Sequence, residues 1–154
     1  MALVNDVHHI AFLTADMDRL ISFYARIFDA RVTLDVADPA RHAFIEIGPH
    51  TVLHPFEVPA AEVPGRQPMF ARGRLDHFAL NAVSEEAFRE IRRRVVAEGA
   101  QATEGGLVTD MGALLSFTFH DPDEAWVEVM WVKPGVRFED APTGPAEWRM
   151  IDLD

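Results

Sequence analysis

An internal repeat limits the folds open to this chain of 154 residues more than any other feature. The segment DVHHIAFLTADMDRLISFYARIFDA at residues 6–30 resembles LDHFALNAVSEEAFREIRRRVVAEGA at residues 75–100. Each segment begins with the alternating apolar residues of a strand and passes through an N-cap residue, Asp16 or Ser84, into a helix. His9 and His77, 68 residues apart, occupy matching places in this pattern. The duplication predicts two similar modules.

Short strands follow the helix in each repeat. The first helix carries an apolar stripe with the spacing of a core-facing helix, and the second ends near Gly99, a typical C-terminal residue. Strands are expected over residues 30–36, 42–48 and 50–58, then over 101–109, 113–120 and 125–132. Each repeat therefore has the order β-α-β-β-β.

The predicted fold class is α+β, with two tandem βαβββ modules at residues 1–58 and 74–133. Residues 59–73 form a connector with the proline and glycine content of a breaker, and residues 134–154 form a C-terminal arm that packs over the body. The length and the 49% of hydrophobic residues are typical of one globular domain.

Charge and cysteine content exclude several classes of function. The formal net charge of −11 would repel nucleic acid, and the basic run at residues 92–94 is interpreted as a solvated helix face. The absence of cysteine excludes disulfides, thiolate metal sites and a cysteine nucleophile. The sequence has no recognisable leader and no apolar run of about 18 residues, which predicts a cytoplasmic protein without a membrane segment.

The alternation of side chains along the strands predicts which polar residues can meet. His9 and His77 lie on the first strand of each repeat, and His54 and Glu128 interrupt an apolar face of each last strand. A carboxylate on an apolar face is costly unless an arginine or a metal ion pairs with it. If the two modules curl toward each other, His9, His77 and Glu128 converge with His54 on a divalent cation. Two histidines and a carboxylate suit Fe²⁺, Mn²⁺, Zn²⁺, Ni²⁺ or Co²⁺.

Other residues of these strands are interpreted as surroundings of that site. The apolar and amide side chains expected to line a substrate pocket are Phe44, Phe56, Asn81, Trp126 and Met130. The histidines without a repeat partner, interpreted as surface or turn residues, are His8, His42, His50 and His120. Of these, His120 at a strand end is the one placed to line the mouth of a cavity.

Together with FHDPDEAWVEV at residues 119–129, these segments resemble the vicinal oxygen chelate superfamily. That superfamily includes glyoxalase I, extradiol dioxygenases, methylmalonyl-CoA epimerase and the fosfomycin- and bleomycin-resistance proteins. The resemblance covers about residues 5–134 and implies two modules that form an open, cupped barrel around a central cavity with a metal ion. Its ligand positions fall on His9, His77 and Glu128, and a fourth, a glutamate in many glyoxalases, falls on His54.

The resemblance implies a divalent-metal-dependent enzyme of glyoxalase type acting on a small oxygen-bearing substrate by proton transfer, isomerisation or lyase chemistry. In such members the metal is a Lewis acid and a carboxylate moves the proton, here Glu128 or Glu46. One alternative is an Fe(II) dioxygenase, although TDMGALLSFTF at residues 109–119 lacks the expected His and Tyr. Another is a metal-free protein that sequesters a small molecule. A homodimer is expected because symmetric pairs are the commonest soluble oligomers.

Overall fold

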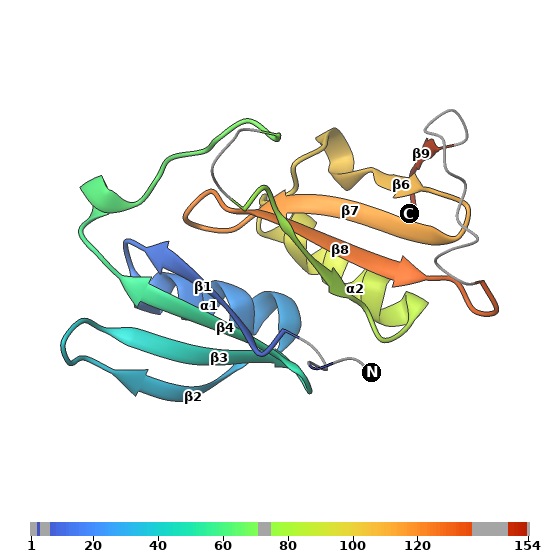
Figure 1. The fold of residues 1–154 in the computed structure, drawn as a ribbon. Coiled ribbons are helices and arrows are strands. Elements are labelled where there is room, and N and C mark those ends of the chain that lie inside the picture. The colour runs from blue at the N-terminus through green and yellow to red at the C-terminus, as the bar shows by residue number, and fades with distance from the viewer. Residues whose placement is uncertain (1–2, 4–6, 71–74, 137–147, 154) are drawn as a thin grey trace. The chain divides into compact units, whose positions relative to one another are not determined.

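The structure is a computed structural model that describes residues 3, 7–70, 75–136 and 148–153. It divides into two compact units, Met1–Gln67 and Pro68–Asp154. Each unit is an open sheet with one helix on one of its faces (Figure 1), which confirms the α+β class and the two-module organisation. The boundaries of the connector and of the C-terminal arm stay predictions. Within the described ranges, no helix has the length and apolar character needed to cross a membrane.

The first unit has the predicted βαβββ order. Its elements are β1 (His9–Thr14), α1 (Met17–Phe28), β2 (Arg31–Val36), β3 (His42–Gly48), β4 (Thr51–Glu57) and a short 3-10 helix, η1 (Ala60–Glu62). The strands lie in the order β1-β4-β3-β2, with β1 and β4 parallel and the other pairs antiparallel. The first and last strands of the module are therefore neighbours, as a shared site on them requires.

Helix α1 begins where its sequence predicts. The Asp16 side chain accepts a hydrogen bond from the Arg19 backbone N–H at 3.0 Å, which satisfies an otherwise unpaired amide of the first turn. The helix ends at Asp29, whose φ of 54° is left-handed. Its buried residues are Met17, Leu20, Phe23, Tyr24 and Ile27. They form the core of this unit with the buried residues of β3 and β4, Ala43, Ile45, Leu53 and Pro55.

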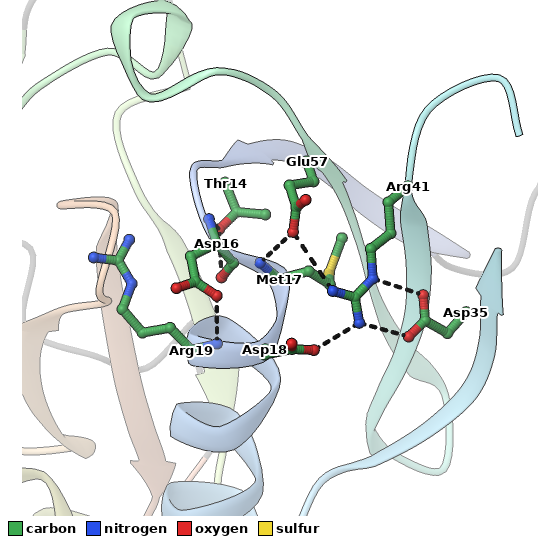
Figure 2. Close-up of polar contacts among 8 residues, drawn as sticks. All are labelled: Thr14, Asp16, Met17, Asp18, Arg19, Asp35, Arg41 and Glu57. Atoms are coloured by element: carbon green, nitrogen blue, oxygen red, sulfur yellow. Dashed lines mark hydrogen bonds and ion pairs between the residues drawn. The ribbon is translucent and has the colours of Figure 1, made fainter. Parts of the chain in front are cut away.

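Arg41, just before β3, joins four parts of the first unit (Figure 2). Its guanidinium donates to both carboxylate oxygens of Asp35 at 3.2 and 2.9 Å and to Asp18 at 2.6 Å. Glu57, at the end of β4, lies 3.6 Å from the same guanidinium and accepts a 2.8 Å hydrogen bond from Met17 N. These contacts connect the start of α1 to the ends of β2 and β4. The Arg41 hydrogen bond lowers the pKa of Asp35 although burial opposes the shift.

The second unit repeats this topology and extends it by one strand. Its elements are β5 (Phe78–Asn81), α2 (Glu85–Ala97), the 3-10 helix η2 (Glu104–Gly106), β6 (Val108–Asp110), β7 (Leu114–His120), β8 (Trp126–Val132) and β9 (Arg149–Ile151). The strand order is β5-β8-β7-β6-β9, again with the first and fourth strands of the module parallel. The Ser84 side chain caps α2 by accepting from Ala87 N at 3.1 Å, and Gly99 after the helix has φ 69°, so both predicted end signals are confirmed.

The prediction of a strand over residues 101–109 is wrong for most of that range. Gln101 makes only an isolated bridge to Phe119, and η2 follows it. Gly105 and Gly106 have φ values of 65° and 66°, a left-handed conformation that interrupts an extended strand. A continuous strand in this region therefore begins only at Val108, in the short strand β6.

The prediction of a solvated basic face on α2 is wrong for Arg92, whose side chain is 7% exposed. Its guanidinium donates to Gly106 O at 2.8 Å and Gly105 O at 3.3 Å, and it pairs with Asp152 at 3.1 Å. The arginines at 93 and 94 do lie on the polar face, where both pair with Glu90. Arg92 thus ties α2 to the C-terminal strand β9, whose pairing with β6 adds an edge strand to the sheet. Much of the predicted arm, residues 137–147, lies outside the described residues.

Candidate metal site

The predicted site residues lie at equivalent positions of the two sheets. Ala11 of β1 is opposite His54 of β4, and Ala79 of β5 is opposite Glu128 of β8. His9 and His77 each precede the corresponding alanine by two residues. Side chains two residues apart on an extended chain point to the same side. Each unit therefore carries one histidine and one further nitrogen or oxygen donor on matching positions of its sheet.

In the second unit, His77 and Glu128 are in contact. His77 Nε2 lies 3.2 Å from Glu128 Oε2, and the two side chains are 31% and 14% exposed. On the other side of the ring, His77 Nδ1 lies 2.9 Å from Asp76 Oδ2. The buried hydroxyl of Ser116 on β7 donates to Glu128 Oε1. Both donors of this unit are thus held by a second side chain.

The chemistry of the His77–Glu128 contact fits a metal ion. Nδ1 of His77 must carry the ring proton, because an ionised Asp76 can only accept. In a neutral ring Nε2 then presents its lone pair to Oε2 of Glu128, which is also an acceptor, so a cation between the two atoms is stabilising. Two ligands at about 2.1 Å from one ion, at octahedral or tetrahedral angles, lie about 3.0 to 3.4 Å apart. The observed 3.2 Å falls in that range.

In the first unit, imidazole rings gather around His54. The rings of His9 and His42 each have their centroids 5.2 Å from that of His54. His42 Nδ1 lies 3.0 Å from His54 Nε2, and His8 Nδ1 lies 2.9 Å from His9 Nδ1. Burial, and then the neighbouring rings of His42 and His9, lower the pKa of His54. The shift favours the neutral ring, which is the form that binds metals.

The residues predicted to line a pocket lie next to the candidate donors. In the first unit Phe44 and Phe56 pack on the His54 ring, with centroid distances of 4.5 and 4.4 Å. In the second unit Asn81 is opposite Met130 in the register of β5 and β8. Trp126, two residues before Glu128, packs against His120 at 4.0 Å. Their role toward a substrate stays a prediction.

Glu46, the second candidate for proton transfer, lies on β3 of the first unit. It is two residues from Phe44 and therefore on the same face of the sheet. Arg31 Nε donates to its Oε2 at 2.8 Å, and the Glu46 side chain is about one-third exposed, at 33%. One carboxylate oxygen is thus held by an arginine of the edge strand β2.

Two of the histidines interpreted as surface or turn residues are not. His42 is half-buried within β3 and contacts His54, and His120 is 8% exposed at the end of β7. Both belong to central strands, which cover them on two sides. His8 and His50 are exposed, as predicted.

Sequence reasoning missed the side chains that hold the candidate ligands, namely His8, His42, Asp76 and Ser116. A signal was available for two of them. Asp76 and His8 immediately precede the paired histidines, so the offset of 68 residues already aligns them. His42 and Ser116 required the strand register as well.

Within the described part of the chain, no three His, Asp or Glu side chains are arranged to hold a metal ion. Asp76 does not add a third donor, because it binds Nδ1 of His77 while Glu128 faces Nε2. Each unit by itself therefore offers a pair of candidate donors.

Residues 6–129 match the family model of the Glyoxalase/Bleomycin resistance protein/Dioxygenase superfamily. A search of curated protein sequences gave no significant match.

Solved structures of low sequence identity share the fold. A glyoxylase/bleomycin resistance protein/dioxygenase domain from Frankia sp. EAN1pec has a TM-score of 0.70 at 17% identity, covering 84% of this chain and 99% of its own. The fosfomycin resistance protein FosX from Listeria monocytogenes has a TM-score of 0.65 at 17% identity, with coverages of 86% and 97%. Lactoylglutathione lyase from Agrobacterium tumefaciens has a TM-score of 0.61 at 20% identity, with coverages of 87% and 99%. A variant of the Listeria protein was crystallised with Mn(II) and 1S,2S-dihydroxypropylphosphonic acid.

Proposed function

The chain belongs to the Glyoxalase/Bleomycin resistance protein/Dioxygenase superfamily, and we propose that it is a divalent-metal-dependent enzyme of glyoxalase type. The observation that carries the proposal is the His77–Glu128 contact, in which Nε2 and Oε2, two possible metal-binding atoms, lie 3.2 Å apart. The Mn(II) in FosX, a protein of the same fold, is consistent with a metal in this chain.

The proposed ligands are His9, His77 and Glu128, with His54 as a fourth. All are nitrogen or oxygen donors, so the site takes Fe²⁺, Mn²⁺, Zn²⁺, Ni²⁺ or Co²⁺ rather than an ion that needs thiolates. The lowered pKa of His54 supports its inclusion, because a neutral ring needs no deprotonation to bind metal. The ligands of one site come from one chain or from the two chains of a homodimer.

When bound, the metal supplies Lewis acidity toward the oxygens of a small substrate. The chain itself supplies a carboxylate that accepts a proton from the substrate and returns it at another atom. Glu128 is the first candidate, and Ser116 orients it through Oε1. Glu46 is the second, with Arg31 holding its Oε2. Apolar side chains around the donors, Phe44 and Phe56 among them, favour a partly hydrophobic substrate.

Metal analysis of the purified chain tests the proposal. Wild type is expected to take up about one first-row transition ion per ligand set, whereas His77→Ala and Glu128→Ala lose stoichiometric binding. His50→Ala is the matched control, because this histidine is exposed in the turn between β3 and β4. Unchanged metal content in folded His77→Ala would refute the ligand assignment, and no uptake by wild type would favour a metal-free binding protein.

The reaction class is tested by assays of the metal-loaded protein. Suitable substrates are 2-oxoaldehydes with a thiol, epimerisable thioesters and, for the alternative dioxygenase activity, catechols with Fe²⁺ and oxygen. Glu46→Gln and Glu128→Gln separate the two candidate proton carriers. If Glu46→Gln keeps the metal and loses turnover, Glu46 moves the proton. The homodimer and the cytoplasmic location stay predictions.

A further inference from the structure

The two units hold their candidate ligands in the same way. The residue before each of the paired histidines His9 and His77 contacts Nδ1 of that histidine at 2.9 Å: His8 does so in the first unit and Asp76 in the second. Each fourth-strand donor is contacted from the third strand, His54 by His42 and Glu128 by Ser116. The register makes this equivalence exact, because His42 is opposite Phe56 and Ser116 is opposite Met130, each two residues beyond the donor. Such a duplicated arrangement indicates a role connected with the donors themselves.

Asp76 is fixed on two sides. Its Oδ1 accepts a hydrogen bond from Phe70 N and its Oδ2 faces His77 Nδ1. The backbone N–H of Phe70 can only donate, so it holds the carboxylate in one orientation. The other oxygen then requires a proton on Nδ1 of His77, and in the neutral ring this leaves the lone pair on Nε2.

Ser116 has the corresponding effect on Glu128. Ser116 is buried, with 4% of the residue exposed, and its hydroxyl donates to Oε1 of Glu128. A hydrogen bond on Oε1 restricts rotation of the carboxylate and leaves Oε2 on the side of His77 Nε2. Both donor atoms are therefore set before a metal binds.

We propose that Asp76 and Ser116 are positioning residues that assign Nε2 of His77 and Oε2 of Glu128 to the metal. This inference rests on the proposed function, because it describes how the ligands of that site are prepared. Hydrogen bonds of this kind fix the tautomer and orientation of a ligand, and their loss commonly costs about 10- to 100-fold in metal affinity.

The equivalent side chains of the first unit fix their partners less firmly. A carboxylate accepts only and therefore determines where the proton lies, whereas His8 and His42 can each donate or accept. If His42 donates to Nε2 of His54, the His54 lone pair is already used. His54 can bind a metal only when His42 accepts, and then through Nδ1. The second unit is therefore expected to contribute more to metal affinity than the first.

Asp76→Asn tests this role, because it preserves the shape of the side chain and reverses the direction of its hydrogen bond with His77 Nδ1. Phe70 N still requires an acceptor, so the amide oxygen of the asparagine takes the place of Oδ1 and its NH₂ group faces His77. Nδ1 must then accept, and the ring proton moves to Nε2. Nitrogen-15 NMR of the metal-free full chain should show His77 with its proton on Nδ1 in wild type and on Nε2 in Asp76→Asn. His8→Asn, at the equivalent position, is the matched control and should leave the His77 signal unchanged.

The same variants are then titrated with Mn²⁺ and Zn²⁺ by calorimetry. Asp76→Asn and Ser116→Ala are expected to weaken binding by about 10- to 100-fold. Ser116→Thr keeps the hydroxyl and should restore most of the affinity lost in Ser116→Ala. A purely structural role for Asp76 would lower stability without moving the ring proton, so circular dichroism of each variant is recorded alongside.

The ring-proton position and the metal affinity distinguish a failure of the positioning role from a failure of the proposed function. An unchanged His77 tautomer in Asp76→Asn, or wild-type metal affinity in both Asp76→Asn and Ser116→Ala, overturns the positioning role. A tautomer that switches as expected supports that role. The proposed function is judged separately, by whether wild type binds metal.

Discussion

Replacing Arg41 with methionine is expected to lower the free energy of unfolding by about 2 kcal/mol. The substitution keeps most of the apolar stem and removes only the guanidinium that joins Asp18, Asp35 and Glu57 (Figure 2). Because Asp18 and Asp35 both contact the same Nη2 atom, the variant leaves two carboxylates close together without their cation. Repulsion between them adds to the loss of the hydrogen bonds.

The size of the expected loss in unfolding free energy follows from how exposed each ion pair of Arg41 is. The two-point contact with Asp35 is the strongest, since the side chains are 29% and 36% exposed, and it should contribute about 1 kcal/mol. Asp18 is 80% exposed, so its pair contributes only about 0.3 kcal/mol. Glu57 at 3.6 Å adds about 0.5 kcal/mol, and the repulsion left behind accounts for the remainder.

Urea unfolding at low salt measures this loss, with Arg31→Met as the matched control. Arg31 forms a single pair with Glu46 and its side chain is 78% exposed, so its loss should cost less than about 0.5 kcal/mol. A double-mutant cycle with Asp35→Asn should give a coupling of about 1 kcal/mol that shrinks in 1 M salt. A loss below about 0.5 kcal/mol in Arg41→Met, or a coupling of zero, would show that the network does not stabilise the unit.

Three further predictions concern stability. Asp35 has a pKa below its ordinary value, so its contribution is present above the unfolded pKa of about 3.9 and is lost as the pH falls through the folded value. Asp35→Asn should therefore destabilise the chain at pH 7, and this loss should shrink as the pH falls below about 3.9 in acid titrations of unfolding. A loss that does not change with pH contradicts this. Gly105→Ala should lower the free energy of unfolding by about 1 kcal/mol because φ is positive at this residue. Gly106→Ala should lower it by about 1 kcal/mol more, because the added Cβ would also lie 2.6 Å from Val96. Equal melting temperatures for the two would refute the clash. Arg92→Met should lower the free energy of unfolding by about 2 kcal/mol and speed amide hydrogen exchange in β9. Unchanged exchange in β9 would show that Arg92 does not hold this strand.

Local signals in the sequence predicted most of the fold. Asp16 and Ser84 cap their helices as expected, and the offsets that pair His9 with His77 and His54 with Glu128 correspond to equal positions in the two sheets. Caps and alternation are local and therefore readable from the chain. The failure at residues 101–109 came from the two left-handed glycines, which a pattern of apolar residues does not reveal.

The side chains around the candidate ligands were harder to predict because they depend on contacts across strands. Ser116 meets Glu128 only through the register of β7 and β8, and His42 meets His54 only through that of β3 and β4. Arg92 was misread for a similar reason. Two of its partners are backbone carbonyls, which no pattern of side chains reveals, and the third, Asp152, lies far along the chain.

A crystal structure of the chain loaded with Co²⁺, with anomalous diffraction at the cobalt edge, would show which side chains bind the metal. One anomalous peak is expected about 2.0 to 2.3 Å from both His77 Nε2 and Glu128 Oε2, with His9 completing the set. A peak bound to other residues, or no peak between His77 and Glu128, would refute the ligand assignment.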